Sequence, residues 1–180
     1  MHDIKIENHV QYRVQPLAMP VAAEVMRHAW RVLQPIPSKW VSAGTALGLY
    51  RGDGLIEGDT DLDVAMLGFE GVERVLHGIL LPAGFTHIRS VHCDGLPMQL
   101  AYMARDTIFD IYLHWPEGDS YVNRVPAGKT AMPRSMYDRL IDLPTPLGTF
   151  AFPGDIEGYL SKRYGNWRVP SASKSAYEAL

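Results

Sequence analysis

Residues 42–63 read Ser-Ala-Gly-Thr-Ala-Leu-Gly-Leu-Tyr-Arg-Gly-Asp-Gly-Leu-Ile-Glu-Gly-Asp-Thr-Asp-Leu-Asp, and this stretch decides the fold. Gly44 and Thr45 lie between a short apolar segment, typical of a buried strand, and a segment that favours a short helix. The backbone N–H groups at such a helix start, together with the threonine hydroxyl, suit an anion such as phosphate. A glycine-rich loop then leads into the next strand.

Two aspartates close this stretch. Asp61 and Asp63 flank Leu62 at the start of a strand predicted over residues 62–67. Side chains two residues apart on a strand share one face, so we expect Leu62 to face the core and both carboxylates to face solvent. Two like charges so placed repel each other unless a cation lies between them. Oxygen ligands of this kind favour Mg²⁺.

A third acid lies inside a later β-prone segment, Ile108-Phe109-Asp110-Ile111-Tyr112. An aspartate within an apolar run is costly to bury alone, so we expect Asp110 to complete the same metal site from a neighbouring strand. A Gly-Thr helix start, an acid-x-acid pair and a third acid on a later strand match the signature of the nucleotidyltransferase fold. The fold class predicted is therefore α/β (α+β), with a short mixed β-sheet flanked by helices.

Apolar periodicity and β-propensity locate the remaining elements. We expect helices over residues 21–33, 45–51, 72–81, 133–143 and 156–164. We expect strands over residues 39–43, 62–67, 85–91, 98–103, 107–113 and 121–125, a turn at 94–95 and a peripheral strand or arm within 1–19. No domain boundary is evident, so we predict one domain over residues 1–180, with residues 171–180 as a tail.

Composition excludes several classes of protein. The chain has 180 residues, 47% of them hydrophobic and 21% charged, which is typical of a soluble domain. A net charge of −3 without a basic stripe gives no support for nucleic-acid binding. A single cysteine excludes an intrachain disulfide. No apolar run approaches the roughly 18 residues of a membrane span, and the N-terminus lacks the pattern of a signal peptide, so we expect a cytoplasmic protein.

The seven histidines do not show the spacing of a zinc site. No pair has the helical His-x-x-x-His spacing. His92 and Cys93, which follow His87 later in the sequence, are adjacent to each other and therefore point to opposite faces of a strand. We therefore expect no zinc site. His114, just after the Asp110 strand, is the one histidine expected near the acids, the alternative being that it only ends the strand.

Three segments carry a more specific pattern. They read Gly44-Thr45-x-Leu47-Gly48-x-x-Arg51-x-x-Gly54-x-Ile56-x-x-Asp59-x-Asp61-Leu62-Asp63, Phe109-Asp110-Ile111-Tyr112, and Tyr159-Leu160-x-x-Arg163-Tyr164-Gly165-Asn166-Trp167-x-Val169-Pro170. In this order they resemble three motifs of the LicD/fukutin family of phosphotransferases. The departures from that family are Glu57-Gly58 in place of Pro-Trp, Thr60 within a run of three aspartates, and Asn166 in place of Asp.

The resemblance implies a role for each matching residue. Asp61, Asp63 and Asp110 would be catalytic and would bind one or two Mg²⁺ ions, with Mn²⁺ as a substitute. The donor site would be formed by Gly44, Thr45, Arg51, Asp59, Arg163 and Trp167, with Asp59 orienting the metal ligands. The alternative for the last segment is that its aromatic residues only anchor the final helix to the core.

The family transfers phosphocholine or alditol phosphates from CDP-activated donors to glycans. The resemblance therefore implies a Mg²⁺-dependent transferase that moves such a group from CDP-choline or a CDP-alditol to a sugar hydroxyl. One alternative is a nucleotidyltransferase that moves an NMP from an NTP to a small molecule or macromolecule. Another is a nucleotide-binding relative without turnover. The partners expected are a nucleotide-diphosphate donor and a carbohydrate or small-molecule acceptor, with no nucleic acid.

Overall fold

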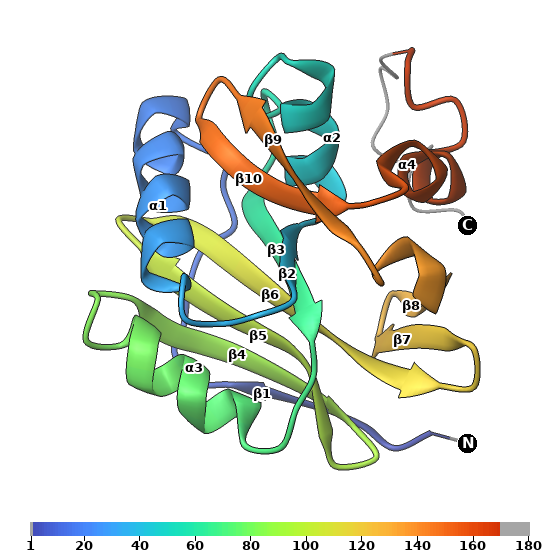
Figure 1. Cartoon of the computed structure of the whole chain (residues 1–180). Helices are drawn as coiled ribbons and strands as arrows, with labels where there is room; N and C mark the ends of the chain where they lie inside the picture. The colour runs from blue at the N-terminus through green and yellow to red at the C-terminus, as the bar shows by residue number, and fades with distance from the viewer. Residues whose placement is uncertain (1, 170–180) are drawn as a thin grey trace.

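The computed structural model describes residues 2–169 as a mixed α+β fold, in which helices lie against a mostly antiparallel sheet (Figure 1). Its helices are α1 (Met19–Val32), α2 (Ala43–Arg51), α3 (Val72–Leu80) and α4 (Ile156–Tyr164), with a 3₁₀ turn at Arg134–Met136. Its strands are β1 (Ile4–Asn8), β2 (Lys39–Val41), β3 (Asp61–Leu67), β4 (Thr86–Cys93), β5 (Leu96–Ala104), β6 (Thr107–Glu117), β7 (Ser120–Val125), β8 (Gly128–Pro133), β9 (Leu140–Thr145) and β10 (Gly148–Pro153). The predicted tail at 171–180 lies outside the described residues.

The main sheet has the strand order β1-β4-β5-β6-β3-β2, and the β7–β8 hairpin extends from β6. Within this path β3 and β6 run parallel, and the other neighbouring pairs are antiparallel. The long chain segment between β3 and β6 forms α3, β4 and β5, and this crossover makes the parallel pairing possible. The parallel register sets Asp63 directly beside Asp110.

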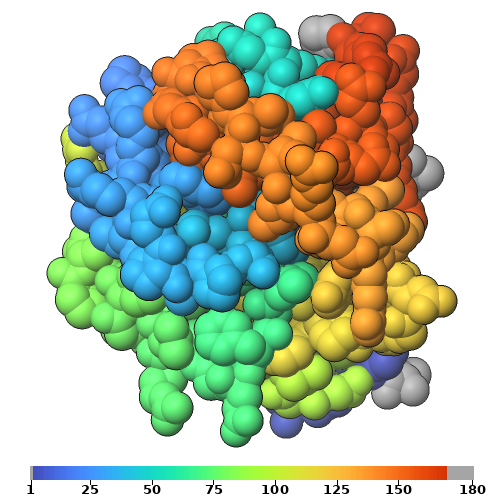
Figure 2. Space-filling view, in the orientation of Figure 1, coloured from blue at the N-terminus to red at the C-terminus, as the bar shows by residue number. Residues whose placement is uncertain are grey.

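The two faces of the β3–β6 pair differ in chemistry. Alternate residues of both strands are fully buried and join the core with apolar residues of α1 and α3; in the strands these are Leu62, Val64, Met66, Phe109, Ile111 and Leu113. Figures 1 and 2 show α1, α3 and the β9–β10 hairpin covering the sheet on the side facing the viewer. Because strand side chains alternate, Asp63 and Asp110 occupy the opposite face from this apolar layer.

Four predicted helices and all predicted strands are present, with ends shifted by a few residues. The helix predicted over residues 133–143 is wrong. The structure has the end of β8, one 3₁₀ turn and the start of β9 there, and β9 then pairs with β10, a strand that the sequence did not reveal. Single apolar residues spaced by three or four favoured a helix, but from Leu140 onward exposure alternates as in a strand. Pairing with β10 therefore overrides the local helical pattern.

Candidate active site

Three carboxylates meet on neighbouring strands. Asp61 and Asp63 lie two residues apart on β3, and Asp63 pairs in register with Asp110 on β6. One carboxylate oxygen from each residue lies within 4.8 Å of the others. The structure therefore brings together the three acids that the sequence singled out, although they are separated by up to 49 residues along the chain.

These acids are more buried than the sequence suggested. Leu62 faces the core as expected, but Asp63 and Asp110 are only 5% and 2% exposed, whereas the pair on β3 was expected to face solvent. Burial, followed by the charges of Asp61 and Asp110, raises the pKa of Asp63 well above its usual range. Burial likewise raises the pKa of Asp110 to about 7, although the nearby Arg89 opposes this shift. The fold thus gathers negative charge where water cannot screen it.

The arrangement fits a hard divalent cation. Three carboxylates offer only oxygen ligands, which are those that Mg²⁺ and Mn²⁺ accept. The Oδ1 atom of Asp110 is buried and has no hydrogen-bond partner within residues 2–169. A cation would satisfy that oxygen and offset the repulsion among the three charges.

A glycine corner at the start of α2 abuts the acids. The hydroxyl of Thr45 accepts a hydrogen bond from the backbone N–H of Asp63, at 2.8 Å between Oγ1 and N. A Cβ atom added to Gly44 would lie 2.5 Å from Oδ2 of Asp59 and 3.7 Å from Oδ2 of Asp63. Only glycine therefore allows Asp59 to approach so closely. The first turn of α2, which the sequence identified as a phosphate cradle, lies beside the carboxylates.

Helix α4 fixes the entry to α2. The hydroxyl of Tyr159, a residue that is 1% exposed, lies 2.9 Å from Oγ of Ser42 and accepts a hydrogen bond from the backbone N–H of Ala43 at 3.0 Å. Ala43 has a φ of 43°, which is costly for a residue other than glycine. The contact from α4 thus holds a strained backbone at the glycine corner. The resemblance marked Tyr159 only as part of a motif, and the structure shows what it contacts.

The two C-terminal residues predicted to bind the donor have different surroundings. The positive charge of Arg163 lies close enough to Asp63 to lower the pKa of that carboxyl, against the larger effect of burial. Trp167 is 6% exposed, and its ring centroid lies 5.4 Å from that of Tyr50. Its indole N–H donates to Oγ of Ser161 at 3.2 Å. Trp167 thus anchors the C-terminal segment, as the alternative interpretation proposed, while Arg163 lies near the acids.

Arg51 is engaged away from the glycine corner. It ends α2, about 10 Å along the helix from Gly44 at 1.5 Å per residue. Its Nε donates to the backbone carbonyl of Trp167 at 2.8 Å, and its Nη2 donates to the same carbonyl. The structure therefore places Arg51 as a clamp on the C-terminal segment, whereas the resemblance implied a phosphate contact. A backbone carbonyl that lies so far along the chain leaves no local sequence signal.

Arg89 is a neighbour of the acids that sequence reasoning missed. Its Nη2 lies 3.4 Å from Oδ2 of Asp110, and its Nη1 donates to the hydroxyl of Tyr12 at 2.8 Å. The side-chain amide of Gln99 on β5 also lowers the pKa of Asp110. Arg89 lies next to an irregularity in the pairing of β4 with β5, which breaks the simple alternation of faces. For this reason the sequence does not show on which face of β4 the Arg89 side chain lies.

His114 follows Asp110 on the same face of β6. It is 4% exposed, and its ring lies 5.5 Å from the ring of Trp40 and 5.8 Å from that of Tyr137, between centroids. Burial, assisted by the charge of Arg163, lowers the pKa of His114 to about 3. The neutral ring therefore packs between Trp40 and Tyr137, farther along β6 than the acids.

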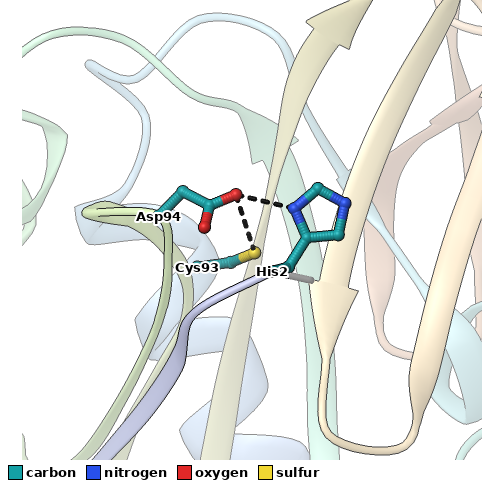
Figure 3. Close-up of side chains that lie close together, drawn as sticks. All are labelled: His2, Cys93 and Asp94. Atoms are coloured by element: carbon teal, nitrogen blue, oxygen red, sulfur yellow. Dashed lines mark hydrogen bonds and ion pairs between the residues drawn. The ribbon is translucent and has the colours of Figure 1, made fainter.

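Two further groups of potential metal ligands occur among the described residues. One joins His2, Cys93 and Asp94, with 2.7 Å between Nδ1 of His2 and Oδ2 of Asp94 (Figure 3). There the other carboxylate oxygen accepts a hydrogen bond from the backbone N–H of Asp3 at 2.9 Å, and burial raises the pKa of the Cys93 thiol. This group therefore ties the N-terminus to the β4–β5 turn. The other group, on α3 and β4, is described below.

Comparisons with known proteins add little to this geometry. No protein-family model matches the sequence, and a search of curated proteins finds no match. Among solved structures, the fold is distantly similar to that of ANT(2")-Ia, an aminoglycoside nucleotidyltransferase, in complex with adenylyl-2"-tobramycin, with a TM-score of 0.44 and 15% identity. The match covers 56% of this chain and 54% of that one, so the chain spans about half the length of the protein it matches. Within residues 2–169, no helix is both long and apolar enough to cross a membrane.

Proposed function

We propose that this chain is a Mg²⁺-dependent transferase of phosphorus-containing groups. The observation that carries the proposal is the meeting of three carboxylates from two parallel strands, within 4.8 Å of one another, beside a helix start suited to phosphate. Nothing in the packing of β3 and β6 needs these charges, because burial and mutual repulsion make them unfavourable there. Their cost to the fold supports a function that requires them.

In this proposal the carboxylates bind metal ions, and the start of α2 binds the phosphate of the donor. Asp61, Asp63 and Asp110 would hold one or two Mg²⁺ ions, or Mn²⁺ in their place. When bound, such ions neutralise phosphate charge and lower the pKa of a coordinated hydroxyl. The N–H groups of the first turn of α2 would bind the donor phosphate, and Arg163 would add positive charge near Asp63.

The donor and acceptor are proposed from the resemblance to the LicD/fukutin family. We infer that phosphocholine or an alditol phosphate is transferred from a CDP-activated donor to a sugar hydroxyl. Transfer of an NMP from an NTP would use the same acids. The two reactions differ in which side of the donor diphosphate becomes the leaving group, so their products distinguish them.

The test is an incubation with each donor class, with products identified by mass. The protein is supplied with Mg²⁺ and a set of sugars, and with either CDP-choline, a CDP-alditol or a labelled NTP. We expect CMP and a phosphocholine-linked or alditol-phosphate-linked sugar. An NMP-linked product with pyrophosphate would instead support nucleotidyl transfer. Nucleotide binding that does not depend on Mg²⁺, with no product from any donor, would indicate a relative without turnover.

Variants connect that activity to the acids. Asp61→Asn and Asp63→Asn preserve the shape of each side chain but remove its charge, so both should abolish turnover and weaken Mn²⁺ binding. Asp53→Asn is the matched control, because Asp53 is exposed in the loop that follows α2. Full activity in either of the first two variants would defeat the assignment of the acids.

A further inference from the structure

A second cluster of potential metal ligands lies where α3 meets β4. It consists of Glu73 and His77 from the helix and His87 from the strand. One ligand atom from each lies within 4.8 Å of the others. None of these residues belongs to the acidic site. Tertiary structure brings His87 to the helix, since nine residues separate it from His77 in a chain that reverses direction between them.

The helix presents two of the ligands together. Glu73 and His77 are four residues apart on α3, so their side chains lie on the same face one turn from each other. The ring centroids of His77 and His87 are 4.5 Å apart. The Nε2 atom of His77 is buried and has no hydrogen-bond partner among residues 2–169. A buried imidazole nitrogen without a partner is unfavourable unless something else binds its lone pair or proton.

The surrounding contacts resemble those that orient metal ligands. The Nε2 atom of His87 lies 3.1 Å from the backbone carbonyl of Arg89, which can only accept a hydrogen bond. The same Nε2 atom lies 3.1 Å from Oγ of Ser90, which can accept as well as donate, so a neutral ring that donates from Nε2 to the carbonyl keeps its lone pair on Nδ1. Oε2 of Glu73 lies 3.2 Å from Nε2 of His92, while Oε1 has a longer contact of 3.5 Å from the hydroxyl of Ser90. Such outer contacts fix both the tautomer and the carboxylate orientation at metal sites.

Solvent reaches the cluster from the helix side. An open pocket is lined by Glu70, Gly71, Glu73, Arg74 and His77. Two of the three candidate ligands therefore line a surface that an aqueous ion can enter, and His87 lies behind them against β4.

We propose that Glu73, His77 and His87 bind a Zn²⁺ ion that links α3 to β4. Two imidazoles and one carboxylate form a ligand set that suits Zn²⁺, unlike the three carboxylates of the acidic site, which suit Mg²⁺. Three protein ligands leave a fourth position for water or for a ligand from outside the chain. The inference does not rest on the proposed function, because the two sites share no residue.

Titration with Zn²⁺ alone tests the site directly. The full chain is kept in excess Mg²⁺, which competes for carboxylate oxygens, and Zn²⁺ binding is measured by calorimetry and by metal analysis after desalting. We expect one Zn²⁺ per chain and a melting temperature that rises with Zn²⁺ concentration. Substitution with Co²⁺ should give the intense visible absorption of a four-coordinate site. Absence of stoichiometric Zn²⁺ binding by the wild-type chain would overturn the proposal.

Variants locate the bound ion. His77→Ala removes a ligand and should weaken Zn²⁺ binding at least about 100-fold, while His92→Gln, which perturbs only the orientation of Glu73, should weaken it about 10-fold. Glu73→Gln provides a second test, since Glu73 is partly exposed and its loss should spare the fold even if His77→Ala does not. Circular dichroism checks that each variant is folded.

Three controls separate this site from the others. His28→Gln removes a histidine that hydrogen-bonds to the carbonyl of Ala83 on a different part of the surface. Cys93→Ser removes the thiol of the group in Figure 3, and Asp63→Asn alters the acidic site. All three should retain one Zn²⁺ per chain with unchanged affinity. Loss of the ion in Cys93→Ser or Asp63→Asn, with retention in Glu73→Gln and His77→Ala, would place it elsewhere and refute the proposal.

Discussion

The acidic site on β3 and β6 and the histidine cluster on α3 and β4 each combine a pair of ligands on one element with a third from another element, but they differ in chemistry. At the acidic site, two residues lie two apart on one strand, and the third lies directly opposite on the parallel neighbour. At the histidine cluster, Glu73 and His77 lie four apart on a helix, and His87 comes from a strand that no pairing register relates to them. The first gathers like charges that repel, and the second gathers rings that are stable when neutral. Ligand chemistry, more than proximity, therefore sets which ion each group can bind.

The largest effect should follow from removing one buried charge at the acidic site. Asp63→Asn should lower turnover by about a thousandfold or more, because it removes a ligand and a charge at once. The same change should raise the unfolding free energy of the metal-free protein, because a neutral amide relieves repulsion from Asp61 and Asp110. Steady-state kinetics and thermal denaturation in a chelator measure the two effects.

A variant of the histidine cluster, Glu73→Gln, serves as the comparison for Asp63→Asn. Glu73→Gln should leave turnover within about twofold of wild type and should not raise metal-free stability, because Glu73 pairs with His92 and is partly solvated. If both variants gained stability, or if both lost turnover, the two sites would not be independent. That outcome would break the comparison.

The second prediction concerns the two glycines of α2, which are closely packed, whereas Gly78 of α3 has open space where a Cβ would lie. A Cβ atom at Gly48 would lie 2.3 Å from the backbone carbonyl oxygen of Gly54, which cannot rotate away. Gly48→Ala should therefore destabilise the fold by about 2–3 kcal/mol. Gly44→Ala meets the side chain of Asp59, which can rotate, so it should cost less stability and more activity. Chemical denaturation and kinetics on the pair measure both quantities, and a larger stability loss at Gly44 would contradict this account.

The third prediction concerns Arg89, the positive charge beside Asp110. Arg89→Gln leaves a buried carboxylate without its ion pair, and the arginine side chain is 26% exposed, so the metal-free protein should lose about 1–2 kcal/mol. Mg²⁺ should restore most of that loss, because a bound cation replaces the missing charge. Denaturation with and without Mg²⁺ measures the difference. A loss that Mg²⁺ does not reduce would show that Arg89 acts through Tyr12 and packing instead.

The acidic site was largely predictable, because its pattern is local on each strand. Asp61 and Asp63 share a face because side chains alternate along a strand. Asp110 lies in the middle of an apolar strand, where an unpaired carboxylate is costly to bury, so its presence indicates a role other than packing. The sequence did not show how buried these acids are. Burial depends on β2, α2 and α4 packing around them, which only the tertiary structure determines.

The histidine cluster and the contacts of Arg51 and Arg89 could not be predicted for a related reason. No spacing rule connects His77 on a helix with His87 on a strand, so their positions in the sequence do not indicate a shared metal site. Arg51 donates to a carbonyl 116 residues later, and the irregular pairing beside Arg89 changes the face that simple alternation assigns. The hairpin of β9 and β10 was missed because pairing between two weak strands, not the pattern within either, stabilises it.

The last prediction, whose effect is smallest at neutral pH, concerns a histidine outside the cluster. His114 is enclosed by Trp40 and Tyr137 and faces the charge of Arg163, and its pKa is lowered from 6.5 to about 3. Because the unfolded chain takes up a proton at higher pH than the folded one, this histidine favours the fold fully above pH 6.5. Its contribution is lost as the pH falls from there toward 3, by up to about 1.4 kcal/mol per pH unit.

His114→Gln removes this titration and leaves the acids in place. The unfolding free energy of the wild-type protein should therefore fall relative to that of the variant as the pH is lowered from 6.5 toward 4. Denaturant titrations at several pH values, in a chelator, give the difference between the two proteins and cancel the contribution of the carboxylates. Their raised pKa values act in the opposite direction, because protonation at low pH favours the fold. A constant difference across this range would mean that His114 takes up its proton at the same pH in the folded and the unfolded protein, and that its ring is not held neutral by burial.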